Sequence, residues 1–233
     1  MEEEIRMDRK KETTYRLNWD NLKSEWPIWT VMAGLLLTAV LVYPHLPEQV
    51  PSHWNLQGEV DDYQGRFFGA FFFPLMTVGL YLLMLVLPLI DPRRDNYARF
   101  RGAYTFLRWG FVIFMAILYG VTIAVALGYG MDVGWVVKAM VAGLFIIIGN
   151  YMGQFRHNYF VGIKTPWTLA NEEVWQRTHR MGGKLWVICG LVCLAVSPFN
   201  TTWAAVVFFG AIMVMAIVPI VYSYLIFARL QPH

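Results

Sequence analysis

Residues 67–90 read FFGAFFFPLMTVGLYLLMLVLPLI and carry no charged side chain. A helix rises about 1.5 Å per residue, so about 20 apolar residues cross a hydrocarbon core of about 30 Å. The stretch is therefore predicted to be a transmembrane helix. Further apolar runs occur at residues 26–43, 103–129, 135–155, 185–199 and 203–227. The sequence thus predicts an all-α integral membrane protein, built as a bundle of about six transmembrane helices.

The composition of the whole chain agrees with a bilayer as its surroundings. Of 233 residues, 57% are hydrophobic and 15% are charged, whereas about 25% are charged in a typical soluble domain. So small a protein has no core large enough to bury that excess of apolar side chains. The net charge of +3 is too small to favour nucleic acid, and no base-contacting motif accompanies it. We therefore expect the lipid bilayer, and no nucleic acid, among its partners.

Lysine and arginine collect on one side of the predicted spans. They precede the first span, follow the sixth, and fill the connections between the second and third and between the fourth and fifth: Arg6, Arg9, Lys10, Lys11, Arg16, Lys23, Arg93, Arg94, Arg99, Arg101, Arg156, Lys164, Arg177, Arg180, Lys184 and Arg229. On the other side Arg66 lies in a loop and Lys138 near a helix end. Basic loops stay inside the cell. The pattern predicts a multi-pass cell-membrane protein with cytoplasmic N- and C-termini, and residues 1–25 lack the features of a secretory signal.

The sequence contains no arrangement typical of catalysis or of metal binding. Its two cysteines, Cys189 and Cys193, are too few for a metal cage and poorly placed for a disulfide. All acidic side chains are expected in the tail or in loops. Arg108, near the inner end of the third span, is expected to extend to the membrane surface. We expect no enzymatic activity, no cofactor and no metal ion.

The outer loop between the first two spans, residues 46–63, reads LPEQVPSHWNLQGEVDDY and is acidic. Two prolines four residues apart favour an extended entry. Gln57-Gly58 indicates a tight turn, because glycine readily adopts positive φ. His53 beside carboxylates suggests a docking site for a cationic peptide or a metal ion, although the spacing fits no standard metal site. The alternative is an ordered extracellular cap over the bundle.

The long inner connection, residues 150–184, carries its own helix signals. Asn171 is a typical N-cap and precedes two glutamates, and the Gly-Gly pair at 182–183 indicates a stop. These signals predict a short amphipathic cytoplasmic helix over residues 172–181, between the fourth and fifth spans. The helix is interpreted either as a face that binds an anionic group or a partner protein, or as an element anchored on anionic lipid headgroups.

The same connection carries a recognisable pattern. Residues 158–169 read NYFVGIKTPWTL and are followed by EEVW at 172–175, THR at 178–180 and GK at 183–184. This pattern closely resembles the signature of the SdpI family. Lys164 stands where that signature has an arginine, which keeps the charge but removes a bidentate contact. The outer loop is similar to the DUF1648 module, and the two resemblances together cover most of the chain.

The SdpI resemblance implies a bacterial membrane protein that gives immunity to a secreted peptide toxin, the sporulation-delaying protein. It also implies a role in signalling, in which a transcriptional repressor is held at the membrane. The implied parts of the chain are a cytoplasmic tail at 1–25, a DUF1648-like helix pair with the acidic extracellular loop at 26–102, and an SdpI-like helical bundle at 103–233. The signature loop of that bundle is 150–184.

The resemblance also implies two groups of site residues. A repressor-like protein is expected to contact the cytoplasmic residues Asn158, Gly162, Lys164, Thr165, Pro166, Trp167, Trp175, Thr178, His179 and Arg180. The toxin is expected to be sensed outside the cell by Pro51, His53, Asn55, Gly58 and Asp61.

Two other functions remain open at this point. The first is a transporter or channel for a small or amphipathic substrate, because Pro74 and Pro219 can kink their spans. A sequence without a buried carboxylate weakens this interpretation, since ion-coupled transporters need ionisable groups on the path. The second is a membrane-embedded enzyme that uses His157, His179 and the glutamate pair at 172–173.

Overall fold

The structure is a computed structural model that describes residues 15–55 and 58–231. The tail residues Arg6, Arg9, Lys10 and Lys11, which were part of the predicted charge pattern, all lie outside these residues. Six helices are long and apolar enough to cross a membrane: α3 (Trp26–Val42), α4 (Arg66–Ile90), α6 (Arg101–Ala126), α7 (Val133–Met152), α9 (Glu172–Val196) and α10 (Thr202–Leu230). The predicted number of spans and the helical class are confirmed.

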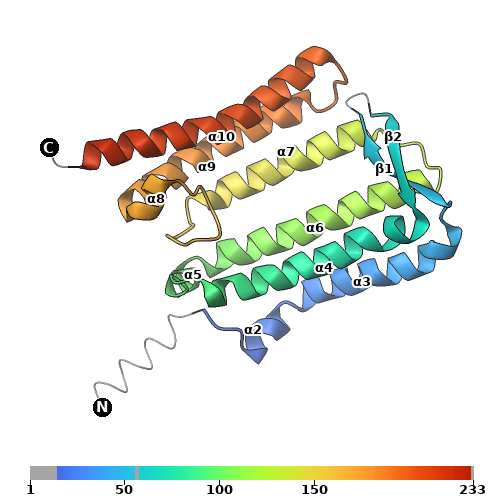
Figure 1. Ribbon diagram of the computed structural model, residues 1–233, viewed down its shortest axis with the longest axis horizontal. Helices are drawn as coiled ribbons and strands as arrows, with labels where there is room; N and C mark the ends of the chain where they lie inside the picture. The colour runs from blue at the N-terminus through green and yellow to red at the C-terminus, as the bar shows by residue number, and fades with distance from the viewer. Residues whose placement is uncertain (1–14, 56–57, 232–233) are drawn as a thin grey trace.

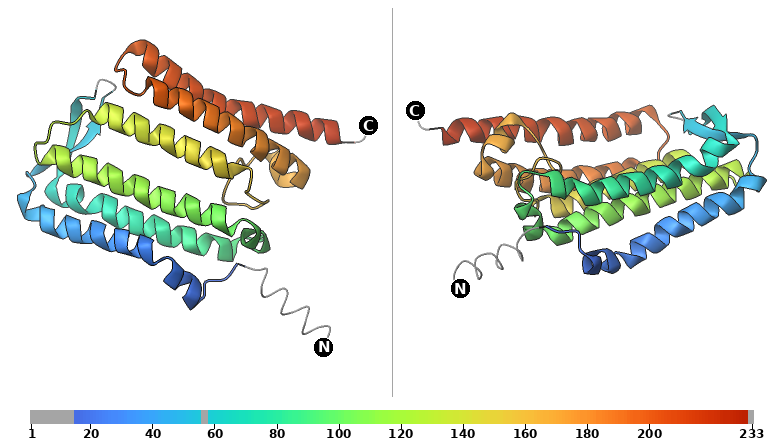
Figure 2. Two further views of the ribbon diagram at one scale, coloured as in Figure 1. Left: turned by 180° about the vertical axis from the view of Figure 1, so that it is seen from behind. Right: turned by 60° about the horizontal axis from the view of Figure 1, so that its bottom comes forward.

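The six long helices run side by side, with roughly parallel axes (Figures 1 and 2). Helices α3, α4 and α6 pack together, α7 and α10 both pack on α9, and α6 contacts α7. Large apolar side chains such as Leu41, Ile90 and Val206 point outward and are exposed. Exposure on this scale suits lipid rather than water, because soluble proteins rarely show large contiguous apolar surfaces. The chain is a multi-pass membrane protein.

The two ends of the bundle differ in structure. Short helices α2 (Trp19–Ser24), α5 (Asp95–Arg99) and α8 (Pro166–Ala170) lie at one end, where α10 also finishes. Strands β1 (Gln49–Trp54) and β2 (Val60–Gly65) form an antiparallel hairpin at the other. We call these the inner and the outer end, after the predicted orientation. The hairpin is an addition to a chain that was predicted as all helical.

The buried side chain of Val50 packs the hairpin against the bundle. Val50 is completely buried, and a Cβ atom on Gly69 of α4 would lie only 2.6 Å from its Cβ. The glycine therefore makes the space that β1 occupies. The pairing register shifts at His53. Gly58 has a φ of +85°, which confirms the predicted glycine turn; Gln57 lies outside the described residues.

The predicted short helix over residues 172–181 is wrong as a separate element. Asn171 does cap it, accepting hydrogen bonds from two backbone amides. The helix then continues through the Gly-Gly pair to Val196 as the fifth span. Those glycines serve close packing: a Cβ on Gly183 would lie 2.7 Å from the backbone oxygen of Gly149 on α7. Small residues let two membrane helices approach, and this approach, rather than a helix end, explains the pair.

Candidate functional site

A cavity of about 610 Å³ opens at the outer end of the bundle. Strand β1, the start of α7, the connection between α9 and α10, and the first turns of α10 line it. Apolar side chains form one part of its wall, with Val137 and Phe208 among them, and polar side chains form the other. Cavities of about 300 to 1,000 Å³ with this mixture are typical ligand sites.

The hairpin brings four of the five predicted outer residues to this region. His53 Nδ1 lies 2.6 Å from Asp61 Oδ1, and both side chains are exposed. Asn55 closes the turn, because its carbonyl accepts a 2.9 Å hydrogen bond from the Gly58 amide. His53 and Asn55 line the cavity. Pro51 instead is buried in the hairpin.

Lys138, near the outer end of its helix as predicted, lines the cavity and was not among the predicted site residues. Its Nζ donates to the Phe199 carbonyl at 3.0 Å and to Asn200 Oδ1 at 2.9 Å. Asn200 Nδ2 in turn donates to Asp132 Oδ2 at 3.2 Å, and Asp132 caps α7. The signal in the sequence was a lysine on the side of the membrane that is otherwise poor in basic residues.

Asn158 organises the inner connection. Its Oδ1 accepts from the Phe160 and Val161 amides at 2.9 and 2.7 Å, and its Nδ2 donates to two backbone carbonyls. Tyr97 donates to Asn158 and to Asp91. Burial raises the pKa of Tyr97, so the phenol stays protonated and remains a donor. The loop is therefore held from within by a buried asparagine and a buried carboxylate.

His179 holds the next part of the loop. Its Nε2 accepts a 2.9 Å hydrogen bond from the Ile163 amide, so the ring proton lies on Nδ1, which donates to the Trp175 carbonyl at 2.8 Å. Trp175 stacks on the ring at 4.0 Å and donates through Nε1 to the Phe155 carbonyl. Both side chains are completely buried. His179 is thus a neutral structural acceptor.

Helix α8 is attached to the last span by hydroxyl groups. Thr165 and Thr168 form a capping box at the start of α8. Thr165 Oγ1 also lies 3.0 Å from Ser223 Oγ of α10, and both side chains are buried. The threonine and proline of the signature therefore start a helix and fasten it to α10.

The ten predicted inner residues fall into buried, half-buried and exposed groups. Asn158, Thr165, Trp175, Thr178 and His179 are buried, whereas Lys164, Pro166 and Arg180 are exposed, and Gly162 and Trp167 are half-buried. The buried residues shape the loop from inside, so that an approaching protein could touch only the others. Lys164 donates to the Phe160 carbonyl at 3.1 Å.

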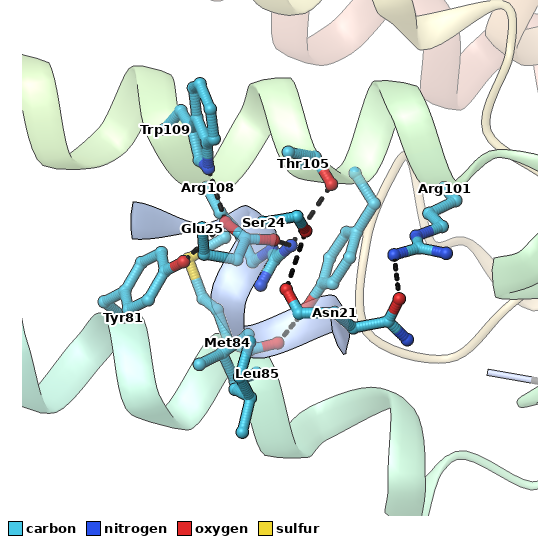
Figure 3. Close-up of polar contacts among 12 residues, drawn as sticks. Asn21, Ser24, Glu25, Tyr81, Met84, Leu85, Arg101, Thr105, Arg108 and Trp109 are labelled. Atoms are coloured by element: carbon cyan, nitrogen blue, oxygen red, sulfur yellow. Dashed lines mark hydrogen bonds and ion pairs between the residues drawn. The ribbon is translucent and has the colours of Figure 1, made fainter. Parts of the chain in front are cut away.

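A buried ion pair that no sequence pattern predicts lies at the inner end (Figure 3). Glu25, just before α3, is 7% exposed and Arg108 of α6 is 3% exposed. Glu25 Oε1 lies 2.6 Å from Arg108, and Oε2 accepts from Tyr81 and Trp109 at 2.7 and 2.5 Å. The expectation that Arg108 extends to the membrane surface is therefore wrong, and Glu25 joins Asp91 as a second buried carboxylate among the described residues. Glu25 belongs to a polar segment, so nothing in its neighbours reveals that it turns inward.

Within residues 15–55 and 58–231, no group of three or more histidine, cysteine or acidic side chains is placed to hold a metal ion. Cys189 and Cys193 are buried free thiols. His53 pairs with a single carboxylate, Asp61. The polar contacts described at the two ends of the bundle therefore link protein groups to one another.

Comparison with known proteins agrees with the resemblance seen in the sequence. Residues 154–223 match the SdpI/YfhL protein family, and residues 30–78 match DUF1648, a domain of unknown function. The chain is 26% identical over 196 residues to the Immunity protein SdpI of Bacillus subtilis (strain 168), a match that covers 84% of this chain and 91% of that protein. No solved structure matches the chain significantly. The predicted similarity to the SdpI family is confirmed.

Proposed function

We propose that this chain is a membrane immunity protein that protects a bacterium against a secreted antimicrobial peptide of the sporulation-delaying kind. The observation that carries the proposal is the similarity to an immunity protein over 84% of the chain. That similarity includes both the outer DUF1648 segment and the inner SdpI segment. The protein has no catalytic role in this proposal, and protection results from binding the peptide at the membrane.

In this proposal the outer end faces outward and receives the peptide. The cavity beside β1 joins apolar and polar walls, which suits an amphipathic peptide. The exposed pair of His53 and Asp61 and the turn at Asn55 and Gly58 lie at its edge or close to it. The charge pattern supports the orientation, because the basic residues gather at the inner end.

The inner end is proposed to hold a repressor-like protein. Among the predicted inner residues, the exposed or half-buried ones that carry a side chain beyond hydrogen are Lys164, Pro166, Trp167 and Arg180. They lie on α8, on the loop before it and on the first turns of α9, which buried hydrogen bonds hold in place. A rigid surface with two cations and one tryptophan is suited to protein recognition, because arginine and tryptophan are enriched among binding hot spots.

The buried ion pair does not favour a transporter instead. The Glu25 carboxylate accepts hydrogen bonds from Arg108, Tyr81 and Trp109, so its charge is compensated in place. It lies at the inner end, where it joins α3 to α4 and α6. A group held by three donors is suited to fixing helices, and we assign it to the architecture.

Expression in a bacterium killed by the sporulation-delaying peptide tests the proposal. We expect cells that carry the protein to survive a concentration of synthetic peptide that kills cells with an empty vector. An unrelated pore-forming peptide serves as the specificity control. Unchanged killing by the sporulation-delaying peptide and by a panel of similar secreted peptides, with the protein present in the membrane, would contradict the proposal.

A further inference from the structure

The outer cavity has a size and a chemistry that point to one part of a peptide. We propose that it binds the apolar C-terminal end of a peptide, with the terminal carboxylate paired to Lys138. The inference rests on the proposed function and names the group that is recognised. It depends on three features of the cavity: its size, its apolar wall and its single lysine.

The volume of the cavity suits a short segment of a peptide ligand. A cavity of about 610 Å³ holds a ligand of drug size, which corresponds to a few residues rather than a whole helix. A chain end can enter such a space without having to turn back out of it. Val137 of α7 and Ala205 and Phe208 of α10 supply apolar contacts for the side chains of that end.

The positive charge of Lys138 favours the carboxyl end of the peptide over its amino end. Lys138 Nζ is held by two neutral acceptors, the Phe199 carbonyl and Asn200 Oδ1. Among the described residues, no carboxylate forms an ion pair with it. Asp132 is bonded to Asn200 and does not reach the amine. An amino end would be repelled by the ammonium group, whereas a carboxylate forms a charge-assisted hydrogen bond with it.

The opposite wall supplies a second polar contact. His53 lines the cavity from β1, and its Nδ1 is engaged by Asp61. The second ring nitrogen, Nε2, forms no hydrogen bond to the residues that the structure describes. The hairpin and α7 approach closely here, because a Cβ on Gly58 would lie 3.6 Å from the Gly134 amide. The two walls are therefore held at a defined separation.

The test compares two forms of one peptide. Full-length protein in nanodiscs is titrated with synthetic sporulation-delaying peptide, either as the free acid or with its C-terminus amidated. We expect the free acid to bind about tenfold more tightly, because the amide loses the charged partner. Lys138→Gln keeps a hydrogen-bonding side chain without the charge, and we expect it to bind both forms equally.

Two variants control for folding and for charge. Lys138→Arg retains the cation and should retain the preference for the free acid. Lys23→Gln removes an exposed lysine at the inner end and should behave as wild type. Equal binding of acid and amide by the wild-type protein, binding of neither, or an unchanged preference in Lys138→Gln would overturn the inference.

A lipid is the competing occupant and gives a different result. If Lys138→Gln reduces the anionic phospholipid that copurifies with the protein while wild type does not discriminate between the peptide forms, the cavity is a lipid site and the inference is overturned. Survival of cells that express the wild-type protein reports on the proposed function separately. Equal binding of acid and amide by the wild-type protein, together with survival of the cells that express it, would leave immunity intact and remove only this site.

Discussion

Gly162 lies against His179 so closely that a Cβ atom at Gly162 would be 2.3 Å from His179 Nε2. Gly162 also has a φ of +119°, a backbone conformation that side-chain-bearing residues rarely adopt. The next residue, Ile163, donates its amide to the same Nε2. The glycine and the histidine of the signature are thus one structural unit, in which the missing side chain lets the loop reach the imidazole.

Gly162→Ala is therefore expected to destabilise the inner connection by about 2 kcal/mol or more, because it combines backbone strain with a clash. Thermal unfolding in detergent and limited proteolysis of the connection measure the change. Gly143→Ala is the matched control, since a Cβ on this α7 glycine meets nothing within 4 Å. Equal stability of the two variants would contradict this account of the signature.

The buried pair of Glu25 and Arg108 predicts a large loss of stability when only one of its two charges is removed. Glu25→Gln leaves the Arg108 guanidinium buried without a counter-charge, and breaking such pairs costs about 3 to 5 kcal/mol. We expect the double variant Glu25→Gln, Arg108→Met to recover part of that loss, as measured in a double-mutant cycle. The exposed pair Glu173–Arg177 is the control, and Glu173→Gln should change stability by less than about 1 kcal/mol. If the effects of Glu25→Gln and Arg108→Met were additive, the two side chains would not be energetically coupled, and this prediction would be wrong.

The sequence was sufficient for five of the six spans, because each is an apolar run long enough to identify it. The fifth was predicted over residues 185–199, whereas α9 begins at Glu172, in a segment too polar to be recognised as part of a span. The sequence was insufficient for the interior contacts. Glu25 stands in a polar segment, and only the folded bundle turns it toward Arg108. The glycines at 182–183 have two physical uses, a helix stop and a close helix contact, and sequence cannot separate them. The contact with Gly149 decides between the two, because it brings in a residue from another helix.

The candidate sites were foreseen to different degrees. At the outer loop, the prolines and Gly58 indicated an ordered element, yet the strand pairing depends on Val50 fitting over Gly69 of α4. Lys138 belongs to the cavity only because the connection after α9 brings Phe199 and Asn200 to it. In the inner signature, the polar and charged residue types predict a contact surface. Asparagine and histidine side chains can equally satisfy buried backbone groups, and here they do.

His157 predicts a dependence of stability on pH. Burial, with Arg93 nearby, lowers its pKa from the ordinary value of 6.5. The unfolded state therefore takes up a proton first as the pH falls. Stability should be constant above about pH 6.5 and decrease below it, toward the lower pKa of the folded state. Thermal unfolding between pH 8 and 5 measures this, and His157→Asn should make the slope shallower, with the buried neutral His179 supplying the remainder. His45→Asn, at an exposed outer position, should not; an equal flattening there would contradict the assignment.

The proposed orientation predicts which positions an impermeant reagent reaches. Glu59→Cys lies exposed on the hairpin and Glu172→Cys lies exposed at the start of α9. In intact cells we expect a membrane-impermeant maleimide to label the first and to label the second only after permeabilisation. The native Cys189 and Cys193 are buried, and the unmodified protein gives the background. Labelling of Glu172→Cys in intact cells would reverse the orientation.

The outer and inner surfaces proposed above predict that immunity and repressor binding can be separated by mutation. Arg180 is exposed at the inner end, so Arg180→Glu reverses a charge without entering the core. We expect it to release a fluorescent fusion of the transcriptional repressor from the membrane while survival under peptide challenge stays at the wild-type level, because like charges across an interface cost several kcal/mol. Arg94→Glu, exposed at the same end on another connection, is the matched control and should retain the repressor. Loss of survival in Arg180→Glu at normal protein levels would mean that the two ends do not act separately, and release by both variants would mean that net charge, rather than this surface, holds the repressor.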